Sequence, residues 1–258
     1  MRSASFLLLL IGFGEAVFVD WAWRVPFLLS AVLVAIGLYV RVSLEETPAF
    51  QALDRDQRAA VPLTIILRDH LRALIQGSLA IVVCYALFYI STVYALGYGV
   101  WALGISRVHF LGLLCGAVVF MALATPLSAA LADRFGRRPV LLVSAVLAIA
   151  VGMAMPALLS AGTVGVFAFL ALALGAMGLT FAPLGALLPE LFPVPVRYTG
   201  AASAYNLGGI LGASFAPSLA QVLEARGGVA WVGYYIAVAG AISFLAVMSM
   251  RETKDRQA

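Results

Sequence analysis

Eight apolar runs, each close to the length of one membrane crossing, constrain this chain more than any other feature. They lie near residues 4–19, 25–43, 71–96, 109–131, 139–159, 163–188, 199–222 and 230–250. A helix needs roughly 20 apolar residues to cross about 30 Å of hydrocarbon, whereas membrane-spanning strands show an alternation that these runs lack. The sequence therefore predicts an all-α integral membrane protein with about eight transmembrane helices, the first of them short.

The composition excludes a soluble domain. Of the 258 residues, 64% are hydrophobic and 11% are charged, against about 45–50% and about 25% in soluble domains. A soluble domain of this size could not bury so much apolar surface. The net charge is +4, and the charged residues are scattered between the apolar runs and form no patch. We therefore expect the lipid bilayer as a partner and no nucleic acid.

The sequence shows no motif of a soluble enzyme and no metal site. Cys84 and Cys115 each lie inside an apolar run, while His70 and His109 are isolated, so no cluster has metal-ligand spacing. A phosphate-binding loop, a GxSxG elbow and an HExxH pair are all missing. We therefore expect no enzyme activity, no cofactor and no metal.

The basic residues predict the orientation, because Arg and Lys in short loops are retained on the cytoplasmic side. With eight spans and the N-terminus inside, only Arg24, Arg107 and Arg226 of the 16 basic residues fall on the outer side. We therefore expect a multi-pass protein of the cytoplasmic membrane with both termini in the cytoplasm. The longest polar break, at 44–70, would be a cytoplasmic linker.

The strongest local motif is the stretch LADRFGRR at 131–138, between the fourth and fifth runs. Gly136 can supply an unusual backbone angle in a tight turn, and the arginines favour a cytoplasmic loop. The stretch resembles the loop motif GxLxDRxGRR of the major facilitator superfamily, with Ala129 in place of the first Gly. The resemblance implies a gating role, and a purely topological anchor is the alternative. The residues concerned are Asp133, Arg134, Gly136, Arg137 and Arg138.

Two further regions narrow the resemblance to the metabolite:proton symporters of that superfamily. WAWRVPF at 21–27 with LEETPAF at 44–50 resembles their fifth-to-sixth helix region. PELFP at 189–193, with RYTG at 197–200 and YNLGG at 205–209, resembles their tenth-to-eleventh helix region. The resemblance covers essentially the whole chain, in order.

This resemblance implies the domain organisation. Such transporters have twelve helices in two six-helix halves, and this chain would begin inside the fifth helix. Residues 1–43 would then be the last two helices of the N-terminal half, 44–70 the linker, and 71–258 the C-terminal six-helix half. We accordingly expect an N-terminally truncated chain, or a start placed too late, without the first four helices that a complete transporter needs.

The function implied is secondary active transport. The resemblance predicts that a small organic acid or zwitterionic metabolite moves with a proton across the cytoplasmic membrane by alternating access. One alternative is a non-transporting, truncated membrane protein. Another is a membrane-embedded enzyme or receptor, although an enzyme should cluster His, Asp or Glu within its spans, which this sequence does not.

Candidate substrate-binding residues lie in the third and seventh runs. Tyr85, Tyr89 and Thr92 follow i, i+4, i+7 spacing, so they predict a polar face that lines a cavity or bonds to other helices. Asn206 could bind a carboxylate or bridge helices, whereas Tyr205 is expected to pack against its neighbours. The seventh run also carries small residues every four positions, which permit close helix packing. These are Gly200, Ala204, Gly208, Gly212 and Ala216.

Glu190 and Arg197 flank a proline-rich cytoplasmic turn. Their opposite charges suggest an ion pair that could act in gating. Two solvated loop charges are the alternative.

Overall fold

The computed structural model describes residues 20–21, 24–43, 62–250 and 252, and all its regular elements there are helical. The predicted all-α fold is confirmed. The elements before the loop motif are α2 (Val25–Ser43), α4 (Pro62–Asp69), α5 (Leu71–Tyr89), η3 (Ile90–Tyr94), α6 (Ala95–Trp101) and α7 (Arg107–Phe135). Those after it are α8 (Arg137–Ser160), α9 (Gly162–Glu190), η4 (Val194–Val196), α10 (Arg197–Gly209), η5 (Ile210–Ser214), α11 (Ala216–Gly227) and α12 (Val229–Met248).

Five helical segments in the described part of the chain are long and apolar enough to cross a membrane. They are Leu71–Trp101, Arg107–Phe135, Arg137–Ser160, Gly162–Glu190 and Val229–Met248. Each corresponds to a predicted run. The run near 4–19 lies outside the described residues. The run near 25–43 forms α2, whose apolar stretch, Ser30–Val40, is shorter than the five segments that could cross a membrane.

The run near 199–222 does not form one continuous helix. It consists of α10, the π-helical turn η5 and α11, with a bend at Phe215. The cause is Pro217, which has no N–H for the carbonyl of Ala213 and whose ring crowds that carbonyl. The seventh span is therefore broken near its middle.

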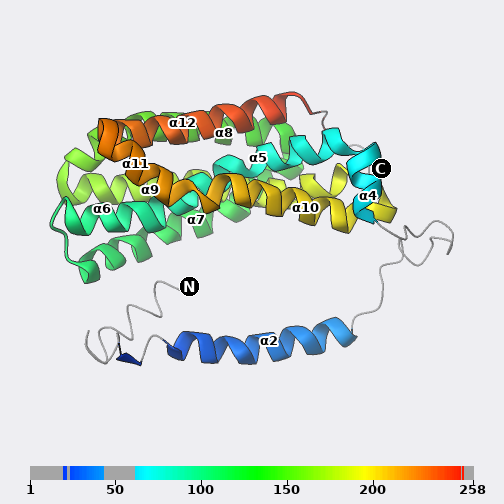
Figure 1. Cartoon of the computed structure of the whole chain (residues 1–258), viewed down its shortest axis with the longest axis horizontal. Coiled ribbons are helices and arrows are strands. Elements are labelled where there is room, and N and C mark those ends of the chain that lie inside the picture. The colour runs from blue at the N-terminus through cyan, green and yellow to red at the C-terminus, as the bar shows by residue number, and fades with distance from the viewer. Residues whose placement is uncertain (1–19, 22–23, 44–61, 251, 253–258) are drawn as a thin grey trace.

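The bundle is organised around α9, which packs against α5, α7 and α8, while α12 packs against α5 and α8 (Figure 1). Glycines allow the closest approaches. A Cβ on Gly152 of α8 would lie 2.6 Å from the carbonyl oxygen of Gly233 on α12, and one on Gly178 would lie 2.6 Å from that of Met121 on α7. At these points the helix backbones touch directly. The buried core between the helices includes Phe110, Phe169, Phe192, Met155 and Leu174.

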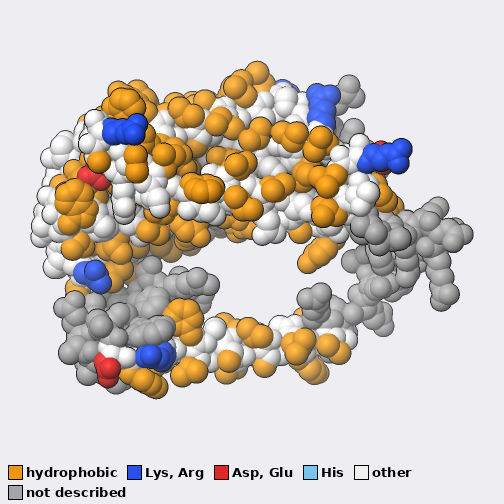
Figure 2. All heavy atoms as spheres, viewed as in Figure 1, with side chains coloured by type: hydrophobic (Ala, Val, Ile, Leu, Met, Phe, Trp, Pro, Cys, Tyr) orange, Lys and Arg blue, Asp and Glu red, His pale blue; other side chains and the backbone are white. Residues whose placement is uncertain are grey.

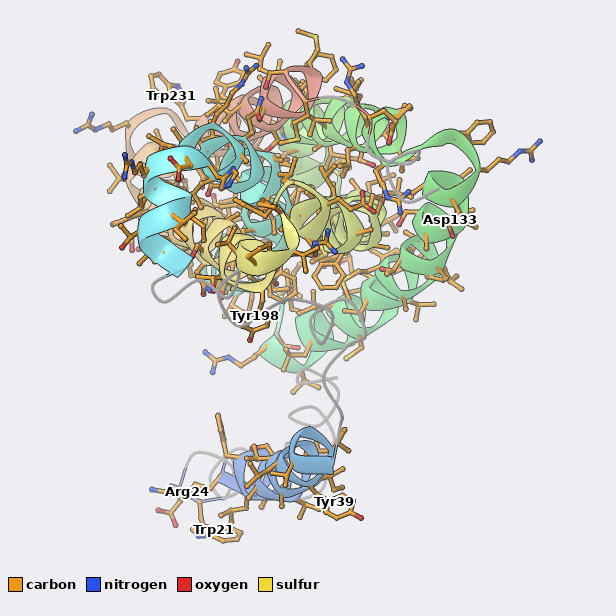
Figure 3. The ribbon with its side chains drawn as sticks, turned by 90° about the vertical axis from the view of Figure 1, so that its right-hand side faces the viewer. Trp21, Arg24, Tyr39, Asp133, Tyr198 and Trp231 are labelled. Carbon is orange, nitrogen blue, oxygen red and sulfur yellow. The ribbon has the colours of Figure 1, made fainter. Side chains whose placement is uncertain are left out.

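The surface of the bundle matches a lipid environment. Hydrophobic side chains cover much of the face seen in Figure 2, and Arg side chains lie toward its ends. Helix α2 lies apart from the bundle in two perpendicular views, and its labelled Tyr39 is 74% exposed (Figures 1 and 3). The part that positions the candidate site is therefore the bundle from α4 to α12.

Candidate functional site

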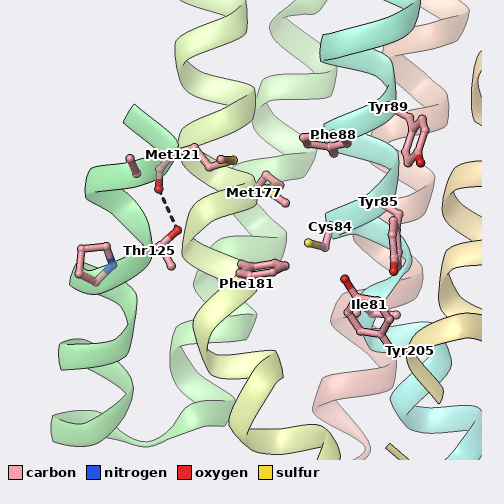
Figure 4. Close-up of a pocket in the computed structure, with 12 residues that line it drawn as sticks. Ile81, Cys84, Tyr85, Phe88, Tyr89, Met121, Thr125, Met177, Phe181 and Tyr205 are labelled. Carbon is pink, nitrogen blue, oxygen red and sulfur yellow. Dashed lines mark hydrogen bonds between the residues drawn. The ribbon is translucent and has the colours of Figure 1, made fainter. Parts of the chain in front are cut away.

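A pocket of about 570 Å³ opens between α5, α7, α9 and α10 (Figure 4). Helix α5 contributes most of its wall, because i, i+3 and i+4 spacing brings several side chains to one face. The lining residues are Ile81, Cys84, Tyr85, Phe88, Tyr89, Met121, Ala122, Thr125, Pro126, Met177, Phe181 and Tyr205.

The pocket lies about halfway along the length of the bundle. Tyr85 stands near the middle of the 31-residue segment Leu71–Trp101, and Met121 and Met177 stand near the middle of the 29-residue helices α7 and α9. If these segments cross the bilayer, the pocket is close to its midplane.

Aromatic rings form one wall of the pocket. The rings of Tyr85 and Tyr205 meet edge-on, with centroids 5.4 Å apart and an interplanar angle of 68°. Those of Phe88 and Tyr89 meet edge-on at 5.5 Å. Room for the Tyr85 ring comes from Gly209, since a Cβ there would lie 3.2 Å from the ring.

The polar groups of the pocket are few and uncharged. Tyrosine hydroxyls can donate or accept hydrogen bonds, and the hydroxyl of Thr125 donates to the carbonyl oxygen of Met121 at 2.8 Å. No lining residue is charged. The surface can therefore hold an apolar or aromatic skeleton and bond to a few polar atoms, but it cannot itself neutralise a full charge.

The structure brings together some of the predicted substrate-binding residues. Tyr85 and Tyr89 line the pocket, whereas Thr92 does not, and its hydroxyl donates to the carbonyl oxygen of Phe88 at 2.6 Å. Thr92 lies in the π-helical turn η3, where wider turns alter the angular spacing that a regular helix would give. This irregularity removes Thr92 from the face that its sequence spacing predicted.

The pocket includes a residue of α10 other than the expected one. Asn206 is exposed and does not line it; its side-chain amide donates to the carbonyl oxygen of Ala202 at 2.8 Å. Tyr205, which we expected only to pack, does line the pocket. The sequence did not identify three further lining residues, Cys84, Phe88 and Phe181. Apolar side chains in an apolar run do not differ in pattern from their neighbours.

The small residues of the seventh run lie on the buried side of their helices. A Cβ on Gly208 would overlap Ile81 and lie 2.6 Å from the carbonyl oxygen of Ser78, and one on Gly212 would lie 2.5 Å from that of Val82. Segments α10 and η5 thus approach the backbone of α5, which fixes Tyr205 beside Tyr85.

The loop motif connects three parts of the chain at one end of the bundle. Gly136 has φ +99°, a value that favours glycine. The carboxylate of Glu252 accepts hydrogen bonds from the backbone N–H groups of Arg137, at 3.1 Å, and Arg138, at 3.0 Å. The carboxylate therefore satisfies N–H groups at the start of α8, where a negative charge is favourable. A Cβ at position 136 would lie 2.6 Å from this carboxylate.

The arginine side chains extend this network. The guanidinium of Arg137 forms an ion pair with Glu190 at 2.9 Å, and Arg138 donates to the carbonyl oxygen of Met248 at 2.9 Å. Asp133 lies exposed on α7 (Figure 3), and Arg134 lies over the ring of Phe135 at 5.2 Å.

Of the two alternatives for Glu190 and Arg197, an ion pair between them or two solvated charges, the structure shows a third arrangement. Glu190 pairs with Arg137, and the Nε of Arg197 donates instead to the carbonyl oxygen of Phe192 at 3.4 Å. The reason is that α8 begins where the neighbouring α9 ends, so Arg137 reaches Glu190 across the helix contact. A pairing across helices is invisible in the spacing along the chain.

Comparison with known proteins fits the helical bundle. Residues 102–258 match the family model described as Major Facilitator Superfamily. The chain belongs to the major facilitator superfamily. It is a multi-pass membrane protein with the fold that the sequence motifs predicted.

Its relatives are named as transporters rather than enzymes. The chain is 42% identical over 261 residues to the inner membrane metabolite transport protein YhjE of Escherichia coli K12, covering 98% of this chain and 59% of that protein. It is 39% identical over 268 residues to a putative metabolite transport protein of Haemophilus influenzae, covering 99% of this chain and 61% of the relative.

A more distant relative is the proline/betaine transporter of Escherichia coli K12, which is 29% identical over 255 residues, covering 94% of this chain and 51% of that protein. The chain thus spans between half and about three-fifths of the length of these relatives.

Proposed function

We propose that this chain is part of a secondary transporter that moves a small organic acid or zwitterionic metabolite with a proton across the cytoplasmic membrane. The observation that carries the proposal is the pocket at half height in the bundle, since substrate sites of such transporters lie near the bilayer midplane. The names of the relatives support transport of a metabolite.

The residues of this pocket would act as one wall of the substrate site. The ring faces of Tyr85, Phe88 and Phe181 would contact the carbon skeleton, and the hydroxyls of Tyr89 and Tyr205 would bond to polar atoms of the substrate. Because this wall carries no charge, a charged group of the substrate would be neutralised by a part of the transporter outside it. Alternating access would then expose the wall to each side of the membrane in turn.

The loop network would support one state of the cycle. The contacts among Arg137, Glu190 and Glu252 gather α8, α9 and the end of the chain at one place. A contact made in only one conformation shifts the equilibrium toward that conformation. Asp133 and Arg134 would face the rest of the transporter there.

Cys84 offers a direct test, because it lines the pocket while Cys115 does not. A whole transporter that contains this chain is purified in nanodiscs, and the rate of alkylation of each thiol is measured with a panel of organic acids and zwitterions at mildly acidic and neutral pH. A substrate should slow alkylation of Cys84 and leave Cys115 unchanged. Tyr85→Ala should abolish the protection, whereas Tyr198→Ala, at a side chain that is 83% exposed outside the pocket, should not.

The absence of any protection at Cys84 would contradict the proposal. If no compound in the panel protects Cys84 in the unmutated whole transporter, and that protein retains its helical content, the pocket is not a substrate wall. The alternative of a non-transporting membrane protein would then be favoured.

A further inference from the structure

A second hollow, of about 700 Å³, lies between α5 and α12. It is separate from the substrate pocket, because Leu79 of this groove and Cys84 of the pocket are five residues apart and point roughly 140° apart on a regular helix. We call it the α5–α12 groove. Its lining residues are Leu71, Arg72, Ile75, Gln76, Leu79, Ile242, Leu245, Ala246 and Ser249.

The groove has an apolar length and a polar mouth. Ile75 and Leu245 are 50% and 57% exposed along its wall. At the mouth, the start of α5 meets the end of α12, and the side-chain amide of Gln76 donates to the hydroxyl of Ser249 at 2.8 Å and to its carbonyl oxygen at 3.1 Å. These hydrogen bonds join the two helices at the mouth, and the rest of the α5–α12 groove is open and apolar.

Arg72 supplies the charge at this mouth. It is exposed, and the described part of the chain gives its guanidinium no hydrogen bond or ion pair. No acidic residue lines the groove. The carboxylate nearest in sequence, Asp69, lies 3.9 Å from Arg68. The mouth is therefore positively charged and open to an anionic group.

The character of helix α4 indicates that this mouth lies at the membrane surface. It is short and amphipathic: Ile66 is buried against the bundle, Leu63 and Leu67 are about half exposed, and Arg68 follows them. Helices of this kind lie at the boundary between headgroups and acyl chains. Because α4 ends three residues before Arg72, we expect the guanidinium to lie at the level of the lipid phosphates.

We propose that the α5–α12 groove is a binding site for one anionic phospholipid. The phosphate pairs with Arg72, and an acyl chain lies against Ile75, Leu79 and Leu245. The stretch from Leu71 to Leu79 provides about 12 Å of apolar wall. Basic pockets between transmembrane helices bind anionic headgroups in this way. A zwitterionic headgroup gains less, since its ammonium offsets the phosphate charge.

Lipid retention measures the charge preference. The purified chain in detergent is titrated with phosphatidylglycerol or with phosphatidylcholine of the same acyl chains, and bound lipid is counted by native mass spectrometry. A basic residue near the surface contributes about 1 kcal/mol to anionic lipid binding, so we expect roughly fivefold tighter binding of phosphatidylglycerol. Arg72→Gln should bring the ratio close to one and Arg72→Lys should retain it. Arg107→Gln, at another exposed arginine, should leave it unchanged.

Fluorescence quenching tests the location. Brominated phosphatidylglycerol should quench Ile75→Trp more strongly than brominated phosphatidylcholine does. Val146→Trp, on the exposed side of α8, should be quenched equally by both lipids. Equal binding of the two lipids, or a preference that survives Arg72→Gln, would overturn the proposal. Loss of quenching at Ile75→Trp together with a doubled particle mass would assign the groove to a second copy of the chain instead.

Discussion

The ion pair between Arg137 and Glu190 should stabilise the fold far more than the exposed ion pair between Arg68 and Asp69 does. The two side chains are 14% and 8% exposed, and their charged atoms lie 2.9 Å apart. Removing one partner of a buried pair leaves an uncompensated charge and costs about 3–5 kcal/mol. Because Arg137 keeps some access to water, we expect Glu190→Gln to lower the free energy of unfolding by about 3 kcal/mol, near the lower end of that range.

Arg68 and Asp69 provide the matched control. Their side chains are 85% and 57% exposed and their charged atoms are 3.9 Å apart. Surface pairs of this kind contribute about 0–1 kcal/mol, so Arg68→Gln should have little effect. Unfolding is measured in mixed micelles with rising SDS content and followed by circular dichroism and tryptophan fluorescence.

A double-mutant cycle isolates the pair from the separate effects of each side chain. The variant with both Arg137→Met and Glu190→Leu should lose less than the sum of the single losses, with a coupling of about 0.5–3 kcal/mol. If Glu190→Gln costs no more than Arg68→Gln, or if the two single losses simply add, the burial argument is refuted.

Three other outcomes are expected. Gly208→Leu should destabilise the chain strongly, because the new side chain would meet Ile81 and the α5 backbone. Gly185→Leu should be tolerated, because there is open space around Gly185. An equal loss of stability in both variants would contradict the close packing at Gly208. Cysteines introduced at Arg55 and Gly227, with both native cysteines replaced, should react with an impermeant thiol reagent in intact cells only at 227, and labelling only at 55 would reverse the predicted orientation. Vesicles that contain residues 1–258 alone should not accumulate substrate, because the described bundle supplies an open wall without a charged partner; robust proton-driven uptake would show that this wall suffices.

The sequence predicted the elements better than their irregularities. Long apolar runs are enough to locate a membrane helix, since few structures satisfy the backbone in lipid. Pro217 marks a kink in the sequence, and the bend at Phe215 lies beside it. The π-helical turns were missed, because a regular period was assumed along each run. Thr92 shows the consequence: its spacing from Tyr85 is correct for a regular helix and irrelevant in η3.

Side-chain pairings were the harder part of the site. Tyr85 and Tyr89 could be found from helical spacing on a single element. Tyr205 and the partner of Glu190 depend on which helices lie side by side, and the chain does not encode that in any short interval. Arg137 is 53 positions away from Glu190 in the sequence, so only the packed bundle brings them together.

The bond from Glu252 to the start of α8 sets an order of events during synthesis. The acceptor is 115 residues downstream of Arg137. At a translation rate of about 5–20 residues per second, roughly 6–23 s pass between the two on the ribosome. Throughout that interval the first N–H groups of α8 must bond to water or lipid headgroups. This end of the bundle can therefore reach its final form only after Glu252 has been made, whereas the α7–α9 contact can form much earlier.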